Sequence, residues 1–543
     1  MQDSSNPDQR VFDYVIVGAG SAGCVLANRL TEDPSIQVLL LEAGDWDTQF
    51  FYKIALGFHN HRYPDADWGY ISEPEPQLEG RKLQLLRGKV LGGSSTVNGM
   101  LYSRGHPGDY DEWQQMGCDG WSYADVLPYF KRSERSWRGE GPYHGGGGAM
   151  HVSKIDTRKL LYDPVAQAAA RLGYPITDDH HGEQPEGFGI GETTTGRGRR
   201  SSASRAFLYP IKARRNLTLE TGAHARKILL KGVRAVGIEY ERDGTRRSVG
   251  ARREVILCGG AYNSPQLLML SGIGPAAELN AIGIQPVRDV PGVGRNLSEH
   301  ASCYVEYAAR GRTLLSELRF DKIAIAMARW WLFGSGLLAS QGTSCHALIR
   351  TLPELTRPDI QLFFNPIRLD ARVWFPGVRA AQEDTLAAII ILLHPESRGS
   401  LSLRSADPAV PPRIQVNLLS QQNDIDTLTR GLRAARQVYA TPPLADLVAG
   451  EINPGSQTQS APALTSYLRK MAGISHHPVG TCSMGRGAMA VVDPQLRVHG
   501  LEGLRVADAS VMPTIPGGNT NAPSIMIGEK AADLIRSDRP ANF

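Results

Sequence analysis

The chain has 543 residues, in which 59 lysines and arginines stand against 55 aspartates and glutamates, a formal net charge of +4. A charge so close to balance gives no electrostatic reason to expect a nucleic-acid partner. A composition of 41% hydrophobic and 21% charged residues excludes a largely disordered chain. The length predicts roughly two to four domains, with a core that needs no disulfide or metal.

The cysteines and the first residues indicate the cellular compartment in which we expect the protein. The six cysteines are scattered singly and include no Cys-x-x-Cys pair: Cys24, Cys118, Cys258, Cys303, Cys345 and Cys482. This usage predicts reduced, buried thiols rather than a disulfide framework or a zinc site, and we expect no bound metal. The first residues lack the basic patch and apolar run of a secretory signal. No segment reaches the ~18 consecutive apolar residues of a spanning helix, so we expect a cytoplasmic protein.

The apolar segment 323–338, which contains Trp330 and Trp331, has two interpretations. A buried helix or a lid over a site is favoured, and peripheral contact with a membrane surface is the alternative.

The first elements predict a βαβ unit. Residues 11–17 form a continuous apolar run, which is typical of a strand buried on both faces. A Gly-rich turn at 18–23 leads into a helix that ends before Pro34. Residues 36–41 then form a second buried strand ending at Glu42, at the spacing expected of a parallel crossover.

Later elements predict two domains. Strands are expected at 217–220, 235–240, 255–257, 359–364, 400–403 and 504–507, and helices from about Ser264 and over 523–535. The strand-then-helix pattern at both chain ends predicts a discontinuous nucleotide-binding domain over 11–155, 205–310 and 475–540. Residues 156–204 and 311–474 then form a second domain. The predicted fold class is α/β with an α+β insert, in which the second domain carries an antiparallel sheet covered by helices.

The turn after the first strand has the chemistry of a dinucleotide site. Gly18 permits the sharp strand-to-helix turn, Gly20 lets a pyrophosphate approach the backbone, and Gly23 lets the helix pack on the strand. The helix N-terminus offers free N–H groups to the phosphates. Glu42, 24 residues after Gly18, can accept ribose hydroxyls and would repel a 2′-phosphate. This motif alone leaves NAD and FAD open.

Three further segments distinguish these cofactors. Residues 87–100 (RGKVLGGSSTVNGM) form a Gly/Ser-rich loop, residues 260–274 (GAYNSPQLLMLSGIG) a helix bracketed by glycines, and residues 475–482 (SHHPVGTC) hold two adjacent histidines. The first two segments resemble the signature segments of the glucose–methanol–choline (GMC) family of FAD-dependent oxidoreductases, and the third resembles its active-site histidine segment. The resemblance runs from about Phe12 to Ile535. Within the family, the sequence most resembles the bacterial branch of alcohol dehydrogenases, choline dehydrogenases and hydroxymethylfurfural-type oxidases.

This resemblance implies a Rossmann-like domain that binds FAD in an extended form, with a substrate domain over the isoalloxazine face. The positions it implies for cofactor contact are Gly18, Ala19, Gly20, Ser21, Ala22, Gly23, Glu42, Ala43, Trp68, Arg87, Gly92, Gly93, Ser94, Asn98, Gly99, Met100, Leu101, Ala225, Ala261, Asp508, Ala509, Asn519, Thr520 and Asn521. Some family members bond the flavin covalently to a histidine. The matching position here is Val97, which has no nucleophile, so we expect non-covalent FAD.

Two residues are the candidate catalytic pair. Oxidising an alcohol removes the hydroxyl proton and a hydride from the same carbon, and a neutral imidazole suits the proton transfer near pH 7. His477 occupies the family position of the catalytic base, whereas the neighbouring His476 would point the other way in an extended segment. Asn519 matches the family's second active-site position. Its amide can hold the substrate oxygen but cannot take up the proton.

Several of these positions also have a purely structural interpretation. Asn521 can cap the last helix, and Asp508 can be a turn or capping acid instead of a ligand for ribityl hydroxyls. Trp68 can pack in the core as well as near the cofactor. The hydroxyls of Ser94 and Ser95 and the side chain of Asn98 are candidate flavin contacts on the same footing as Asp508.

The leading functional hypothesis is FAD-dependent oxidation of an aliphatic or aromatic primary alcohol to the aldehyde. A choline dehydrogenase or oxidase is the alternative. Because we can assign neither a carboxylate nor an aromatic cage for the ammonium group, a neutral alcohol is favoured. A hydroxynitrile lyase or non-redox flavoprotein of the same fold is the alternative of another class. The sequence leaves open whether O2 or another electron acceptor reoxidises the flavin, and whether the protein is a monomer or a homodimer.

Overall fold

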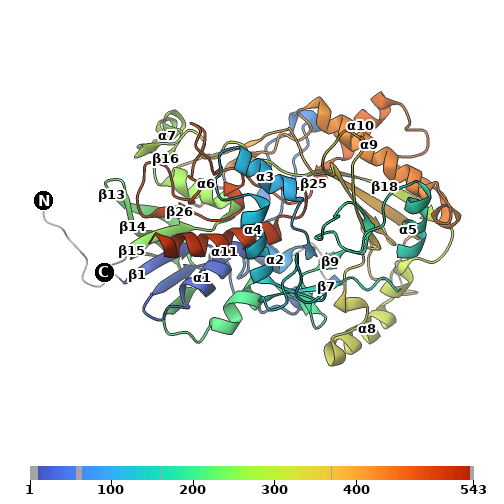
Figure 1. The fold of residues 1–543 in the computed structure, drawn as a ribbon, viewed down its shortest axis with the longest axis horizontal. Coiled ribbons are helices and arrows are strands. Elements are labelled where there is room, and N and C mark those ends of the chain that lie inside the picture. The colour runs from blue at the N-terminus through green and yellow to red at the C-terminus, as the bar shows by residue number, and fades with distance from the viewer. Residues whose placement is uncertain (1–9, 57–63, 159–160, 369, 539–543) are drawn as a thin grey trace, which may run out of the picture.

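The computed structural model describes residues 10–56, 64–158, 161–368 and 370–538. Two sheets of seven strands each lie side by side (Figure 1). The first is built from both ends of the chain and the second mainly from its middle. The predicted class, α/β with an antiparallel second sheet, is therefore confirmed.

The first sheet begins with the predicted βαβ unit. Strands β1 (Val11–Val17) and β2 (Val38–Leu41) pair in parallel and are joined by α1 (Ser21–Leu30). The sheet runs in the order β12 (Leu217–Glu220), β2, β1, β15 (Thr245–Leu257), β14 (Arg234–Arg242) and β13 (His224–Lys231), and β26 (Leu504–Val506) pairs with β15. β1 and β2 are buried almost throughout, which explains their continuous apolar sequence.

The two chain ends meet on one face of this sheet. The last helix, α11 (Asn521–Ser537), packs against α1 and against α4 (Tyr123–Ser133). Figure 1 shows α11 in red lying beside the blue α1. This contact is the one expected if the N- and C-terminal segments build one discontinuous nucleotide-binding domain. Residues 539–540 of the predicted third segment lie outside the described residues.

The second sheet is antiparallel in all its pairings. Its order is β24 (Val448–Asn453), β18 (Ala301–Ala309), β21 (Thr385–Leu392), β20 (Ile360–Asn365), β19 (Cys345–Ile349) and β8 (Gly187–Gly189), and β25 (Gly473–Ile474) pairs with β18. The long helix α9 (Gln422–Tyr439) packs on β21, β18 and β20. Because β18 belongs to this sheet, we propose that the domain boundary predicted at 310 lies before Ala301.

The remaining elements connect or flank the two sheets. They are β3 (Tyr70–Ile71), β4 (Gln84–Leu85), α2 (Ser94–Val97), β5 (Leu101–Tyr102), α3 (Pro107–Gln115), β6 (Glu134–Ser136), β7 (Met150–Lys154), α5 (Tyr162–Arg171), β9 (Glu192–Thr193), β10 (Thr195–Gly196), β11 (Arg199–Arg200), α6 (Gly260–Leu270), β16 (Ile273–Gly274), α7 (Ala276–Ala281), β17 (Arg288–Asp289), α8 (Phe320–Phe333), β22 (Ser400–Ser402), β23 (Arg413–Gln415) and α10 (Ala461–Met471). The helix expected from about Ser264 begins earlier, at Gly260. Within the described part of the chain, no helix is both long and apolar enough to cross a bilayer.

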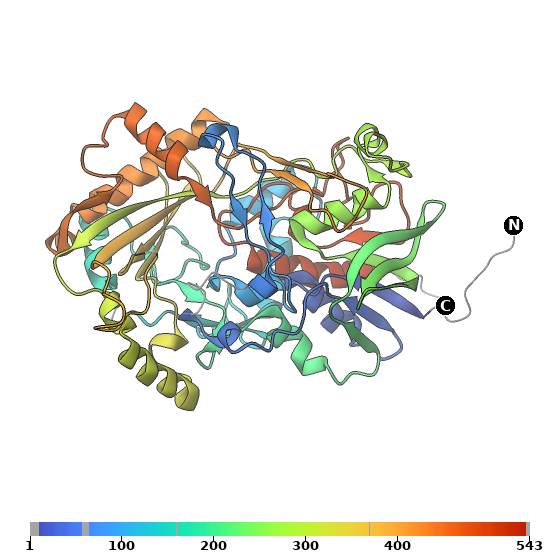
Figure 2. The same ribbon diagram turned by 180° about the vertical axis from the view of Figure 1, so that it is seen from behind.

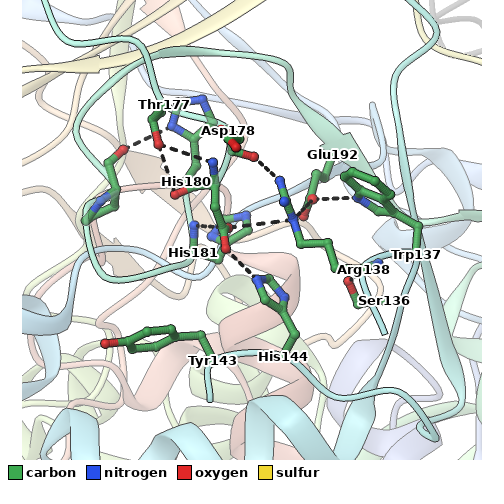
Figure 3. A network of polar contacts seen from close by, with 12 residues as sticks. Ser136, Trp137, Arg138, Tyr143, His144, Thr177, Asp178, His180, His181 and Glu192 are labelled. Carbon is green, nitrogen blue, oxygen red and sulfur yellow. Dashed lines mark hydrogen bonds and ion pairs between the residues drawn. The ribbon is translucent and has the colours of Figure 1, made fainter. Parts of the chain in front are cut away.

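A buried polar network holds the loop before β8 against the segment that follows α4 (Figure 3). His144 lies between two carboxylates, with Nε2 2.8 Å from Asp179 and Nδ1 3.3 Å from Glu134. Burial disfavours the imidazolium, but the hydrogen bonds to Asp179 and Glu134 raise the pKa of His144 to about 9. His144 is therefore a charged link between two distant chain segments.

This link predicts a pH-dependent contribution to stability. Because the folded pKa lies above the unfolded value, the stabilisation is fully present below about pH 6.5 and is lost as the pH rises through about 9. We expect His144→Ala to lower the free energy of unfolding by about 2 kcal/mol at pH 6. The difference from the wild type should vanish above pH 9 in denaturant melts. A pH-independent difference would show that His144 acts only through packing.

Candidate active site

A cavity of about 570 Å³ lies between the two sheets, and all three motif segments contribute to its walls. Nearly every predicted cofactor position lines it: Gly18, Gly20, Ser21, Ala22, Glu42, Ala43, Trp68, Arg87, Gly93, Ser94, Asn98, Gly99, Met100, Leu101, Ala225, Ala261, Asp508, Ala509, Asn519, Thr520 and Asn521. Ala19, Gly23 and Gly92 are absent from the lining. They support the site from behind: a Cβ on Gly23 would lie 1.9 Å from the Gly18 carbonyl oxygen, and the Gly92 amide donates to the Ala19 carbonyl.

The two glycine-rich loops approach each other at the N-terminus of α1. A Cβ on Gly93 would lie 2.9 Å from the Gly20 Cα. The two motifs therefore meet at bare backbone, and both glycines line the cavity there. N–H groups and the helix dipole at this end favour phosphate.

Glu42 is fixed at the end of β2. Its two carboxylate oxygens accept hydrogen bonds from the Ala19 and Gly44 amides, each at 2.9 Å. Burial raises the pKa of Glu42 to about 7, although those amides favour the charged form. Each oxygen keeps a second lone pair for a ribose hydroxyl.

Two residues with competing interpretations are placed by the structure. Asp508 accepts from Gly260 N and Ser264 Oγ at the start of α6, and from Ser510 N in the turn after β26, so it is a turn acid that also lines the cavity. Asn521 does not cap α11, because the N-cap is Thr520. Its Oδ1 instead accepts from Ser21 Oγ at 2.7 Å, which ties α11 to α1.

His477 and Asn519 lie together at the other end of the cavity. Asn519 Nδ2 is 2.9 Å from His477 Nε2, and both residues line the cavity. On its far side, His477 Nδ1 is 3.0 Å from Nδ1 of His300, a residue that we did not predict. His300 Nε2 in turn lies 3.0 Å from the Leu393 carbonyl oxygen.

This chain of contacts fixes the tautomer of His477. Burial lowers the pKa of His300 to about 3, so its imidazole is neutral and only one ring nitrogen carries a proton. A carbonyl oxygen only accepts, so His300 donates from Nε2 to Leu393 and accepts at Nδ1. His477 then donates from Nδ1, which leaves its Nε2 lone pair facing Asn519 and the cavity. Burial first, and then the neighbouring His300 and Arg87, lower the pKa of His477 well below its usual value. The imidazole is therefore neutral at physiological pH and holds an acceptor nitrogen toward the cavity.

A buried carboxylate holds the two histidines in place. Glu299 Oε1 accepts from the backbone N–H groups of His477 at 2.6 Å and His300 at 3.0 Å. Burial raises the pKa of Glu299 to about 7, although Arg87 favours its charged form. Neither Glu299 nor His300 carried a motif that we recognised. The only available signal was two consecutive titratable residues just before an alternating strand.

His476 differs from its prediction. It has a φ of +62°, so the segment is not extended at that residue, and both histidines line the cavity. Strand alternation therefore does not separate them. His477 is distinguished instead by its contacts with Asn519 and His300.

The comparisons with known proteins agree on one family. Residues 12–302 and 395–528 match models of GMC oxidoreductases. The chain is 42% identical over 535 residues to an oxygen-dependent choline dehydrogenase of Sinorhizobium fredii, covering 97% of this chain and 96% of the relative. The fold is similar to pyridoxine 4-oxidase from Mesorbium loti (TM-score 0.88, 30% identity, 97% and 100% of the chains). It is also similar to a fungal aryl-alcohol oxidase (TM-score 0.85, 26% identity, 97% and 99%). The chain belongs to the GMC oxidoreductases, and is an FAD-dependent enzyme that acts on a CH–OH group.

The residues present fit FAD. Bare backbone at Gly20 and Gly93 suits the pyrophosphate, and Glu42 suits a ribose. At the opposite end, Asn519 Oδ1 and Gln341 Oε1 are buried acceptors bonded to no other described residue. Both oxygens can therefore accept a hydrogen bond from a ring system or a substrate.

Val97 predicts how the flavin is held. Its side chain lines the cavity and offers no nucleophile. We expect acid precipitation of the purified holoenzyme to release the flavin into the supernatant, as measured by its visible absorbance. A yellow pellet after repeated washing in denaturant would contradict non-covalent binding.

Proposed function

We propose that this enzyme oxidises an uncharged primary alcohol to the aldehyde, with His477 as the base and Asn519 as the group that holds the substrate oxygen. The observation that carries the proposal is the His477 imidazole, kept neutral and presenting Nε2 to the cavity beside Asn519. His477 accepts the hydroxyl proton at Nε2, and the Asn519 amide orients the oxygen from which it comes. Bound FAD supplies the hydride acceptor.

The electrostatics of the substrate end favour an uncharged alcohol. The walls contributed by the second sheet and its connections are neutral: Ser302, Gln341, Thr343, Phe363, Asn365, Ile389 and Ile391. Among the described lining residues, the carboxylates are Glu42 and Asp508, and both are held by backbone amides in the nucleotide-binding fold. A quaternary ammonium group needs a nearby carboxylate or an aromatic cage. Among the described lining residues, these walls contribute one aromatic ring, Phe363, and no carboxylate.

Choline is the second candidate, because the Sinorhizobium relative at 42% identity is named a choline dehydrogenase. A lyase or non-redox role is the third, because such chemistry also uses a base. Net oxidation separates the third candidate from the other two, and the charge of the alcohol separates those two from each other.

The test is anaerobic reduction of the bound flavin by a panel of alcohols. Benzyl alcohol, hydroxymethylfurfural and short aliphatic alcohols should bleach the flavin absorbance, and choline should do so far more slowly at equal concentration. Faster bleaching by choline would overturn the neutral-substrate proposal, and no bleaching by any alcohol would favour the lyase or non-redox role. Hydrogen peroxide measured in air then tells whether O2 or another acceptor takes the electrons.

We also propose a cytoplasmic location. The support is that all six cysteines are free and buried, as expected of a protein kept in a reducing compartment.

A further inference from the structure

The helix α8 (Phe320–Phe333) exposes apolar side chains along its length. Only Trp330 is fully buried, in a cluster with Ile54 and Leu338. The exposed apolar side chains include Phe320 at 61%, Ile325 at 69%, Trp331 at 59%, Leu332 at 69% and Phe333 at 74%. Figures 1 and 2 both show α8 projecting from the edge of the molecule. An exposed apolar patch of this kind marks an interaction surface, and the expected buried helix does not describe it.

A neighbouring loop extends this patch. The Phe375 and Phe320 rings lie 6.3 Å apart, and Val378 on the same loop is 84% exposed. The loop also carries exposed Arg372 and Arg379. Apolar side chains at the patch are thus flanked by cations.

The second feature is a strongly basic groove of about 980 Å³. Eight arginines line it: Arg29, Arg132, Arg135, Arg197, Arg199, Arg200, Arg205 and Arg536. Glu32 is the one acidic residue among the described residues of its wall. We call this feature the arginine groove.

Part of this positive charge is not neutralised by carboxylates. Arg29 and Arg132 pair with Glu529 in the helix α11 behind the groove. Arg536 pairs with Glu32, and Arg205 lies 3.6 Å from Asp47. In contrast, Arg135 Nε donates to the Gly148 carbonyl, a neutral partner. Burial, followed by the charges of Arg135 and Arg197, lowers the pKa of His151 in the same groove, as expected in a positive field.

The arginine groove and α8 are joined by the hairpin of β10 and β11. Trp330 Nε1 donates to the Gly198 carbonyl at 2.6 Å, and the Arg199 guanidinium lies 5.3 Å over the Trp330 ring. A Cβ on Gly198 would lie 1.9 Å from the Gly334 carbonyl oxygen, so the hairpin backbone rests on the C-terminal end of α8. Exposed Arg197 and Arg199 therefore lie beside the end of the helix that carries Trp331, Leu332 and Phe333.

We propose that α8 and the arginine groove together form a docking surface for an anionic phospholipid bilayer. The apolar side chains of α8 enter the interface, where Trp, Phe and Leu are favoured. The arginines beside them contact headgroup phosphates, which they match in charge and hydrogen-bonding geometry.

A second copy of this chain is the competing occupant of the apolar face. Two copies related by a symmetric contact through α8 would bring their basic hairpins toward each other, since Arg197 and Arg199 are next to the patch. That arrangement would place like charges close together, which is electrostatically unfavourable. An anionic bilayer would attract the arginines and bury the apolar side chains at the same time.

Vesicle co-sedimentation of the full-length holoenzyme tests this surface. The wild type should bind vesicles of phosphatidylcholine and phosphatidylglycerol and bind pure phosphatidylcholine much more weakly. The triple variant Trp331→Ser, Leu332→Ser, Phe333→Ser should lose affinity by about a hundredfold. The pair Arg135→Ala, Arg197→Ala should lose about tenfold, and high salt should remove the difference between the two vesicle types.

Matched controls use side chains of the same type on other surfaces. Val233→Ser with Val287→Ser removes exposed apolar groups, and Arg246→Ala with Arg247→Ala removes exposed cations. These controls should bind vesicles like the wild type, and all variants should keep their flavin and turn over a soluble alcohol normally. Absence of vesicle binding, or binding that the α8 and groove variants leave unchanged, would overturn the proposal. A wild-type dimer that the α8 variant converts to monomer would overturn it in favour of a second copy.

Discussion

The His477→Ala holoenzyme should fold and stay yellow, yet reduce its flavin about 10²–10⁴ times more slowly under anaerobic alcohol. The expected loss is that of a general base, because Nε2 of His477 is the acceptor nitrogen presented to the cavity beside Asn519. Stopped-flow absorbance measures the reduction rate directly and is independent of the final electron acceptor. Because the native imidazole is neutral, the substitution leaves a buried cavity and no partner charge without its counterion.

His476 provides the matched control for this prediction. It is the adjacent residue of the same type and also lines the cavity, whereas the contacts with Asn519 and His300 described above are those of His477. His476→Ala should therefore cost far less in reduction rate. Equal losses in the two variants, or undiminished reduction in His477→Ala, would refute the assignment of the base.

The sequence was sufficient to predict the parts of the molecule in which one motif determines both the chemistry and the local backbone geometry. The turn at Gly18 and Gly20 needs bare backbone between a buried strand and a helix, and Glu42 follows at the end of the next strand. The pairing of the two chain ends was also predictable, because the last strand and helix complete a sheet that the first strands leave open. Family resemblance added His477 and Asn519, which no local pattern would have distinguished from structural residues.

What the sequence could not show depends on contacts between distant segments. His300 stands 177 residues before His477, and it reaches that ring only because the segment before β18 pairs with the histidine segment at Ser298 and Val479. Gln341 lines the cavity from a connection outside regular structure. The exposed side of α8 was ambiguous for a related reason: a largely apolar helix predicts burial until the elements packed against it are known.

His300 is expected to act as a positioning residue for the base. His300→Ala removes the acceptor that fixes the His477 proton on Nδ1, so part of the imidazole should carry its proton on Nε2, where it cannot act as a base. We expect flavin reduction to slow by about 10- to 100-fold at neutral pH. Burial is the larger cause of the lowered pKa of His477 and His300 is the next, so removing His300 should also raise that pKa. The acid limb of the pH profile for reduction should then move to higher pH.

This shift in the pH profile separates positioning from simple loss of packing. A cavity in the wall of the site would lower the rate at every pH, whereas a changed base moves the limb. His300→Asn restores a side chain that can accept from His477 Nδ1–H and donate to the Leu393 carbonyl, so it should recover part of the rate and of the wild-type profile. His300→Leu fills the space without either bond and should behave like His300→Ala. If His300→Leu recovers as much of the reduction rate as His300→Asn, the hydrogen bond to His477 does not determine where the base carries its proton.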